Sequence, residues 1–178
     1  MPNVIKNARV AFPNLFTPDA KFGKYGAQLI IEPNNPALAA IEAEIEAVAA
    51  AKWGAKAEGI LKTIRATGKV CLKDGDTKAE YEGFEGNMVL SSGNTKRPTV
   101  VNRDRSPVTE DDGIVYAGCY VNAIVSIWAQ DNEFGKRINA SLDGVQFVKD
   151  GDSFGGGNVA SASQFEDLSD GADADDMM

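Results

Sequence analysis

The stretch IVYAGCYVNAIVSIWA, residues 114–129, decides the fold class of this chain. Small and aliphatic residues alternate in it with larger or polar ones, which is the period-two pattern of a β-strand with one buried face. The buried face is predicted to carry Val115, Ala117, Cys119, Val121, Ala123, Val125 and Ile127. The other face offers Tyr116, Tyr120 and Trp128, which either pack under a neighbouring element or stand exposed for stacking.

Shorter strand-like segments lie on both sides of this stretch. Residues 3–12 and 24–32 are rich in β-branched and aromatic residues and predict two strands that pair as a hairpin across a long loop. Gly-containing turns separate the later segments, which are KVCLKDGD, NMVLSS, PTVVN, RINASL and VQFV. Between the two groups, apolar residues at helical spacing predict a helix from Asn35 and Pro36 to Gly54 and a second helix before Gly68. The pattern indicates an antiparallel barrel or sandwich with the helices covering one end.

The last 29 residues hold the whole acidic excess of the chain, because residues 1–149 are balanced with 18 acids against 18 bases. The chain has no Lys or Arg after Lys149, and the carboxylates that follow are Asp150, Asp152, Glu166, Asp167, Asp170, Asp173, Asp175 and Asp176. A Gly/Ser-rich spacer with this acidic end predicts a folded domain over residues 1–154 and a disordered tail over 155–178. The tail is expected to bind partner proteins or the protein's own basic groove, or else only to aid solubility. The residues expected to contact a partner are Asp173, Asp175, Asp176, Met177 and Met178.

The composition excludes several kinds of catalytic site. The chain has no histidine and only two cysteines, too few for the usual catalytic triads or for a tetrahedral zinc site. One tight acidic cluster, made of Asp104, Glu110, Asp111 and Asp112, is a possible metal site, but its context SPVTEDDG favours a solvated turn between strands. No catalytic residue, metal or cofactor is therefore predicted.

Length and apolar patterning predict where the protein works. The chain has 178 residues, of which about 150 can fold, and this favours a single domain. No run of 18 apolar residues and no signal-peptide region occurs in the sequence, so we expect a cytoplasmic protein with no membrane contact. In that reducing compartment Cys71 and Cys119 are expected to be two buried thiols.

The basic residues of the body gather in the loops between strands, often beside aromatic residues, as in KFGKYG and NEFGKR. Basic groups that neutralise phosphates and aromatic faces on which bases stack are what a single-strand binder needs. Surface Lys and Arg also occur on any soluble protein, so these basic residues indicate DNA binding only if they lie on one face. The predicted DNA-binding residues are Lys21, Lys24, Tyr25, Lys96, Arg97, Arg103, Arg105, Tyr116, Tyr120, Trp128, Lys136 and Arg137.

The segments 24–33 (KYGAQLIIEP) and 100–157 resemble phage-encoded single-stranded DNA-binding proteins of the OB-fold type. The resemblance covers residues 3–165, and block 113–157 is its most specific part. It implies an OB-fold barrel, binding of single-stranded DNA without sequence preference, and an acidic tail that contacts other replication proteins. In well-known tailed single-strand binders the tip is aromatic, whereas this chain ends DADDMM.

These observations together predict a mainly β protein, a five-stranded antiparallel OB-type barrel with a helical insert over residues 35–66 and a disordered acidic tail. We expect it to bind and protect single-stranded DNA during phage replication or recombination in the bacterial host cytoplasm, without catalysis and without a cofactor. Its tail is expected to bind replication or recombination proteins. Two alternatives stay open: a protein-interaction adaptor or virion component that does not bind DNA, and a metal-dependent nuclease that uses Asp104, Asp111 and Asp112.

Overall fold

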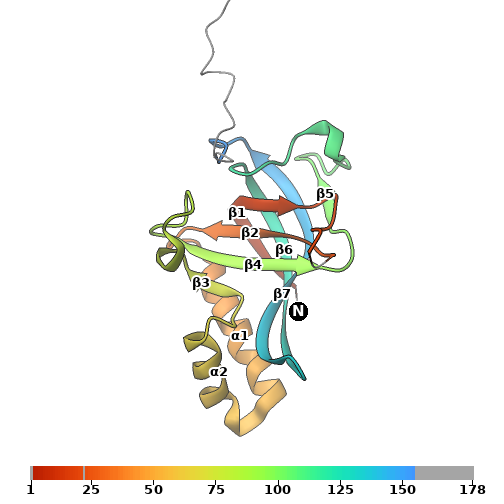
Figure 1. The fold of residues 1–178 in the computed structure, drawn as a ribbon. Coiled ribbons are helices and arrows are strands. Elements are labelled where there is room, and N and C mark those ends of the chain that lie inside the picture. The colour runs from red at the N-terminus through yellow and green to blue at the C-terminus, as the bar shows by residue number, and fades with distance from the viewer. Residues whose placement is uncertain (1, 22, 155–178) are drawn as a thin grey trace, which may run out of the picture.

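The computed structural model describes residues 2–21 and 23–154, which form a twisted sheet of seven strands with two helices at one end (Figure 1). The strands are β1 (Pro2–Asn14), β2 (Tyr25–Ile31), β3 (Leu72–Asp74), β4 (Met88–Asn94), β5 (Thr99–Val101), β6 (Tyr120–Asn132) and β7 (Gly135–Lys149). The helices are α1 (Ala37–Trp53) and α2 (Ala57–Ala66), with short 3₁₀ helices η1 (Gly54–Lys56), η2 (Gly75–Lys78) and η3 (Glu110–Asp112).

Five of the strands close into a barrel. The antiparallel pairs are β4–β2, β2–β1, β1–β6 and β6–β7, and β7 returns to β4 through one parallel pairing, Gly93 with Ser141. This circular order, with a single parallel closure, is the connectivity of an OB-type barrel. The barrel predicted from the sequence is therefore confirmed, and β3 and β5 extend the sheet at its two edges.

The two helices form the insert between β2 and β3 and pack at one end of the barrel beside the β6–β7 hairpin (Figure 1). The Ala37 amide donates to Asn35 Oδ1 at 2.9 Å, so the Asn35 side chain satisfies an amide at the start of α1. The side chains that the helices bury are Ile41, Ile45 and Ala49 from α1 and Ala57, Leu61 and Ile64 from α2. The insert predicted over residues 35–66 is confirmed.

Two features of the last strands differ from the sequence-based expectation. Residues 114–119 are a turn rather than the start of a strand, and β6 begins at Tyr120. The turn arises because Gly118 has φ +110° and its Cα faces the Asp152 carbonyl, where any Cβ would lie 2.1 Å from the oxygen. The segments RINASL and VQFV form one continuous strand, β7, rather than two.

The barrel interior is apolar and is filled by the inward face of each strand. The alternation predicted along residues 114–129 holds from Cys119 to Ile127, since every second residue there is buried. Cys71 and Cys119 are free thiols, as expected, and burial raises the pKa of the Cys71 thiol to about 12. Among residues 2–21 and 23–154, neither helix is long and apolar enough to span a bilayer.

Candidate nucleic-acid interface

The outer face of β1, β2 and β4, which points away from the barrel core, carries a row of side chains in register. Val10, Leu29 and Leu90 point inward and are almost completely buried. Their strand neighbours point outward and align across the strands in the order Lys73, Val89, Ile30, Arg9, Tyr120 and Lys149. This face therefore has an apolar centre and cations toward both of its ends.

The next positions along the same strands are small or polar. Gln28 and Ser91 are register partners on β2 and β4, and the Ser91 hydroxyl donates to Gln28 Oε1 at 2.7 Å. Two residues further along, Gly26 faces Gly93, so neither strand has a side chain there. A Cβ on Gly26 would lie 2.4 Å from the Ser92 carbonyl oxygen, so glycine here lets the two strands approach closely.

Three aromatic rings stand beside this surface. Phe12 packs edge-on against Tyr81, with 5.2 Å between the ring centroids, and against Phe84 at 6.3 Å. Phe84 is buried over Ala11 and Ile30, whereas Phe12 is 54% exposed and Tyr81 is 41% exposed. The Phe12 and Tyr81 rings are therefore open to a ligand.

The backbone at Phe12 holds its ring outward. Phe12 has φ +50°, a conformation that bulky residues adopt rarely, and it lies where the β1–β2 register shifts between Ala11 and Asn14. Strained residues and β-bulges of this kind concentrate at binding sites, where they re-aim a side chain.

The aromatic rings and the sheet enclose a cavity of about 220 Å³. Its walls are Phe12, Gln28, Lys73, Asp74, Gly75, Thr77, Lys78, Tyr81, Phe84, Val89 and Ser91. Two carboxylates hold the backbone of the segment between β3 and β4. Asp74 accepts a hydrogen bond from the Asp76 amide, and Asp76 accepts one from the Gly86 amide. The cavity thus combines rings, lysines and small polar groups on the sheet surface.

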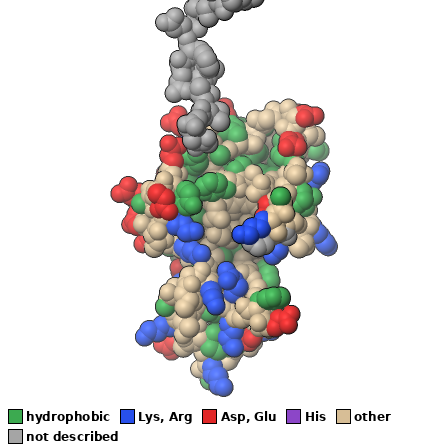
Figure 2. Space-filling view, viewed as in Figure 1, with side chains coloured by type: hydrophobic (Ala, Val, Ile, Leu, Met, Phe, Trp, Pro, Cys, Tyr) green, Lys and Arg blue, Asp and Glu red, His purple; other side chains and the backbone are tan. Residues whose placement is uncertain are grey.

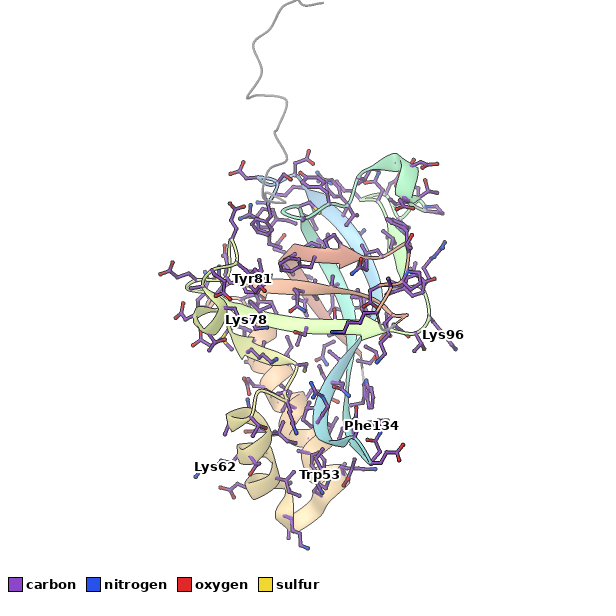
Figure 3. All side chains as sticks on the ribbon, in the orientation of Figure 1. Trp53, Lys62, Lys78, Tyr81, Lys96 and Phe134 are labelled. Carbon is purple, nitrogen blue, oxygen red and sulfur yellow. The ribbon has the colours of Figure 1, made fainter. Side chains whose placement is uncertain are left out.

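Lysines and arginines gather on this side of the molecule. Figure 2 shows hydrophobic side chains on the upper part of the face and a band of Lys and Arg that continues below them over the helical end. In Figure 3, Tyr81 and Lys78 lie at one end of β4 and Lys96 lies at the other end. Burial and the nearby charge of Lys78, followed by that of Arg137, hold the pKa of the Lys73 ammonium below its usual value.

Several predicted binding residues meet at the Lys96 end of β4. The Arg97 guanidinium lies 6.0 Å from the Tyr25 ring centroid and donates to the Phe16 carbonyl at 3.1 Å. Lys24 precedes Tyr25 at the start of β2, and Lys96 follows the end of β4. The structure therefore brings together Lys24, Tyr25, Lys96 and Arg97, with Lys21 in the same β1–β2 loop.

Tyr116 and Tyr120, also predicted, contact the last described residues. Tyr120 lies between two cations, 5.6 Å from the Arg9 guanidinium and 4.8 Å from Lys149 Nζ. The Tyr116 hydroxyl donates to Asp150 Oδ1 at 2.8 Å. Burial and this bond to a carboxylate raise the pKa of Tyr116. The Tyr116 hydroxyl is thus fixed by a hydrogen bond, and its side chain is half-buried.

The remaining predicted residues do not line the cavity. Arg103 and Arg105 are exposed in the turn after β5, at the sheet edge opposite β3. Trp128 is 45% exposed on β6, and its indole N–H donates to Ser141 Oγ at 3.1 Å. Lys136 and Arg137 start β7 at the hairpin, and Lys136 lies 3.8 Å from Asp131.

Two members of the acidic cluster, Asp104 and Asp112, form hydrogen bonds that stabilise the turns in which they lie. Asp104 Oδ1 accepts from the Ser106 amide at 3.0 Å, and hydrogen bonds from Ser106 lower the pKa of Asp104. Asp112 and Thr109 form a capping box around η3. Across the described part of the chain, no three acidic or cysteine side chains come together in a way that suits a metal ion.

The cavity contains residues that the sequence analysis did not select, namely Phe12, Tyr81, Phe84, Lys73 and Lys78. Lys78 and Tyr81 lie in the segment KDGDTKAEYEGFEGN, where acids outnumber bases, so charge clustering did not identify them. The one usable signal was the pair of aromatic residues, Tyr81 and Phe84, in an otherwise polar loop. The predicted tail and its contact residues, Asp173, Asp175, Asp176, Met177 and Met178, lie outside the described residues.

Comparison with known proteins supports a nucleic-acid interface. The family described as "Enterobacter phage Enc34, ssDNA-binding protein" matches residues 1–178. The chain belongs to this family. The family assignment confirms the phage single-stranded DNA-binding function predicted from the sequence. Putative protein p50 of Acyrthosiphon pisum secondary endosymbiont phage 1 is similar in sequence to this chain, with 46% identity over 172 residues, which cover 93% of this chain and 92% of that protein.

Two solved structures are similar to this member of the Enc34 family. One is the single-stranded DNA-binding protein of bacteriophage Enc34 in complex with ssDNA, with a TM-score of 0.71 and 27% identity, covering 85% of this chain and 88% of that one. The other is gp2.5, a single-stranded DNA-binding protein encoded by bacteriophage T7, with a TM-score of 0.56 and 14% identity, covering 90% of this chain and 97% of that one. The second likeness shows a shared fold alone.

Proposed function

We propose that this chain coats single-stranded DNA without sequence preference, with bases on Phe12 and Tyr81 and phosphates on the lysines around them. The observation that carries the proposal is the cavity that joins two exposed rings to Lys73 and Lys78 on the outer side of the sheet. Every base has a π-face, so stacking on such rings tolerates any sequence. The structure of the Enc34 protein with ssDNA supports the nature of the ligand.

The strand would continue from this cavity along β4 toward Lys96, where Tyr25 and Arg97 offer a second ring and a second cation. Lys78 precedes β4 and Lys96 follows it, so cations lie at both ends of one strand (Figure 3). Binding of this kind needs no catalysis and no cofactor. We propose that it protects single strands during phage replication or recombination in the host cytoplasm, and that residues 155–178 bind protein partners.

The experiment is a titration of oligo-dT with the wild-type protein and two variants. Replacing Phe12 and Tyr81 together by Ala should weaken binding by about tenfold or more, since each stacked base contributes about 1–3 kcal/mol. A variant with Val4 and Ile124 both replaced by Ala is the matched control, because these apolar side chains are 57% and 43% exposed, pair across β1 and β6, and lie outside the cavity. Equal affinity for all three proteins would contradict a binding surface at this cavity.

A further inference from the structure

The β6–β7 hairpin is fixed beside β3 by backbone hydrogen bonds. The Cys71 amide donates to the Ile138 carbonyl at 2.9 Å, and the Ile138 amide donates to the Lys69 carbonyl at 3.1 Å. These bonds place Arg137, the neighbour of Ile138, close to Lys73 at the edge of the sheet. The hairpin and the aromatic cavity are therefore contiguous at this edge.

Three cations converge there. Lys73 and Lys78 line one cavity. The positive charges of Lys78 and Arg137 both act on the Lys73 ammonium. None of these three residues forms an ion pair within the described part of the chain. Asp74, the one carboxylate in the cavity wall, accepts a hydrogen bond from the Asp76 amide at 2.9 Å.

In the free protein the charged form of Lys73 is therefore destabilised. The ammonium is partly removed from water and faces two like charges, and both effects lower its pKa. The neighbouring Cys71 thiol has a pKa of about 12 and supplies no negative charge near neutral pH. An oxyanion placed among the three cations would remove this repulsion, and Lys and Arg are the usual ligands of phosphate.

We infer that Lys73, Lys78 and Arg137 together bind one phosphate group of the nucleic-acid strand, so that the strand leaves the aromatic cavity toward the β6–β7 hairpin. The inference rests on the proposed function, and it adds a defined phosphate position and a direction for the strand. It also gives the hairpin a place in the interface.

Phosphate binding at this position has a consequence for protons. A phosphate beside Lys73 favours its charged form and raises its pKa, so the complex takes up a proton wherever free Lys73 is partly neutral. The affinity should therefore fall as pH rises through the lowered pKa of the free protein. The titratable and charged groups that face Lys73 are Lys78 from η2, Arg137 from β7 and Cys71 from its own segment.

The test uses the full-length protein, oligo-dT and three variants, measured by isothermal titration calorimetry. Lys73→Gln removes the charge, Lys73→Arg keeps the charge without titrating, and Lys62→Gln is the control on the exposed side of α2 (Figure 3). Titrations at about pH 9, below the usual lysine pKa of about 10.4, are run in two buffers of different ionisation enthalpy. Salt titrations at pH 7 complete the set.

The inference predicts a different pattern for each variant. Lys73→Gln should flatten the slope of log K against log salt by up to about 0.7, the value for one phosphate on a single strand, because Lys78 and Arg137 remain. Lys73→Arg should keep the slope and lose the proton uptake, and Lys62→Gln should match the wild type in both. An oligonucleotide with a 5′-phosphate separates the two sources of phosphate: tighter binding that Lys73→Gln abolishes indicates a terminal phosphate, and equal binding indicates an internal one.

Two results would overturn the inference. One is an unchanged salt slope in Lys73→Gln, and the other is equal proton uptake by Lys73→Arg and the wild type. If the variant with Phe12 and Tyr81 replaced loses affinity while Lys73→Gln behaves as wild type, the proposed function stands and the phosphate position alone is wrong. If neither variant changes binding, single-stranded DNA does not bind at this face and the proposed function is also wrong.

Discussion

Arg9 stacks on Phe154, with its guanidinium carbon 4.2 Å from the ring centroid. The same guanidinium donates to the Asp152 carbonyl at 2.6 Å and to the Gly118 carbonyl at 3.0 Å. Phe154 in turn packs on the outer-face cluster that contains Ile30. Arg9 therefore fixes the last described residues against the outer face of the sheet, and the acidic segment of the sequence starts at the edge of the candidate interface.

Arg9→Ala should lower the free energy of unfolding by about 1–3 kcal/mol, because two hydrogen bonds from a charged donor and a cation–π contact are lost. Arg9→Lys should recover little of this, since an ammonium cannot reproduce the planar fork of the guanidinium. Arg103→Ala, at an exposed arginine, should stay within about 0.5 kcal/mol of the wild type. Urea denaturation measures all three, and equal stability of Arg9→Ala and the wild type would contradict the role given to Arg9.

Phe12→Asn should separate binding from stability. Asn tolerates positive φ better than Phe does, so relief of backbone strain offsets the loss of a half-exposed ring, and the stability should stay within about 1 kcal/mol of the wild type. The affinity for oligo-dT should fall, because a stacking face is removed.

Phe84→Ala is the contrasting variant. Phe84 is only 3% exposed, so its truncation should cost about 3–5 kcal/mol in thermal or urea unfolding. A large loss of stability in Phe12→Asn would show instead that Phe12 is part of the core.

The β-strand pattern of this chain was sufficient to predict an antiparallel barrel or sandwich, because each inward residue from Cys119 to Ile127 is apolar and each outward neighbour is larger or more polar. The choice of an OB-type barrel came from the family resemblance. Alternation could not predict the aromatic cavity. By strict alternation Phe12 would share the buried face of Val10, and only the positive φ at Phe12 turns its ring outward. Local backbone irregularity of this kind has no period in the sequence.

The cation positions show a second limit of sequence analysis. Arg97 and Tyr25 are distant in the sequence, yet both were predicted, because each lies beside other basic or aromatic residues. Lys73 and Lys78 meet at one cavity only because β3 and η2 fold against β4. Their surroundings in the sequence are acidic, and it is the tertiary contact that makes them neighbours of Arg137.

Replacing Arg103 and Arg105 together by Ala tests how far the strand extends beyond the cavity. If each neutralises one phosphate, the slope of log K against log salt should flatten by about one unit or more, since the slope is about −0.7 per phosphate on a single strand. Asp111→Asn with Asp112→Asn is the matched control in the adjacent η3 turn and should leave binding intact or slightly stronger. Lost binding in the control would favour the metal-site alternative.

Removal of residues 166–178 should tighten the binding of single-stranded DNA at low salt. The deleted segment carries six carboxylates, Glu166, Asp167, Asp170, Asp173, Asp175 and Asp176, and it follows a start that Arg9 and Phe154 fix on the sheet face. Tethering gives these charges a high effective concentration near Lys73 and Lys78, so even a weak contact lowers the apparent DNA affinity by the fraction of time the cations are occupied. The gain should fade as salt screens the attraction, over a Debye length of about 10 Å at 0.1 M. Oligo-dT titrations of both proteins at several salt concentrations measure the effect, with a full-length variant that has all six carboxylates changed to amides as the control for charge. Unchanged or weaker affinity of the truncated protein at low salt would show that the acidic segment does not compete with DNA.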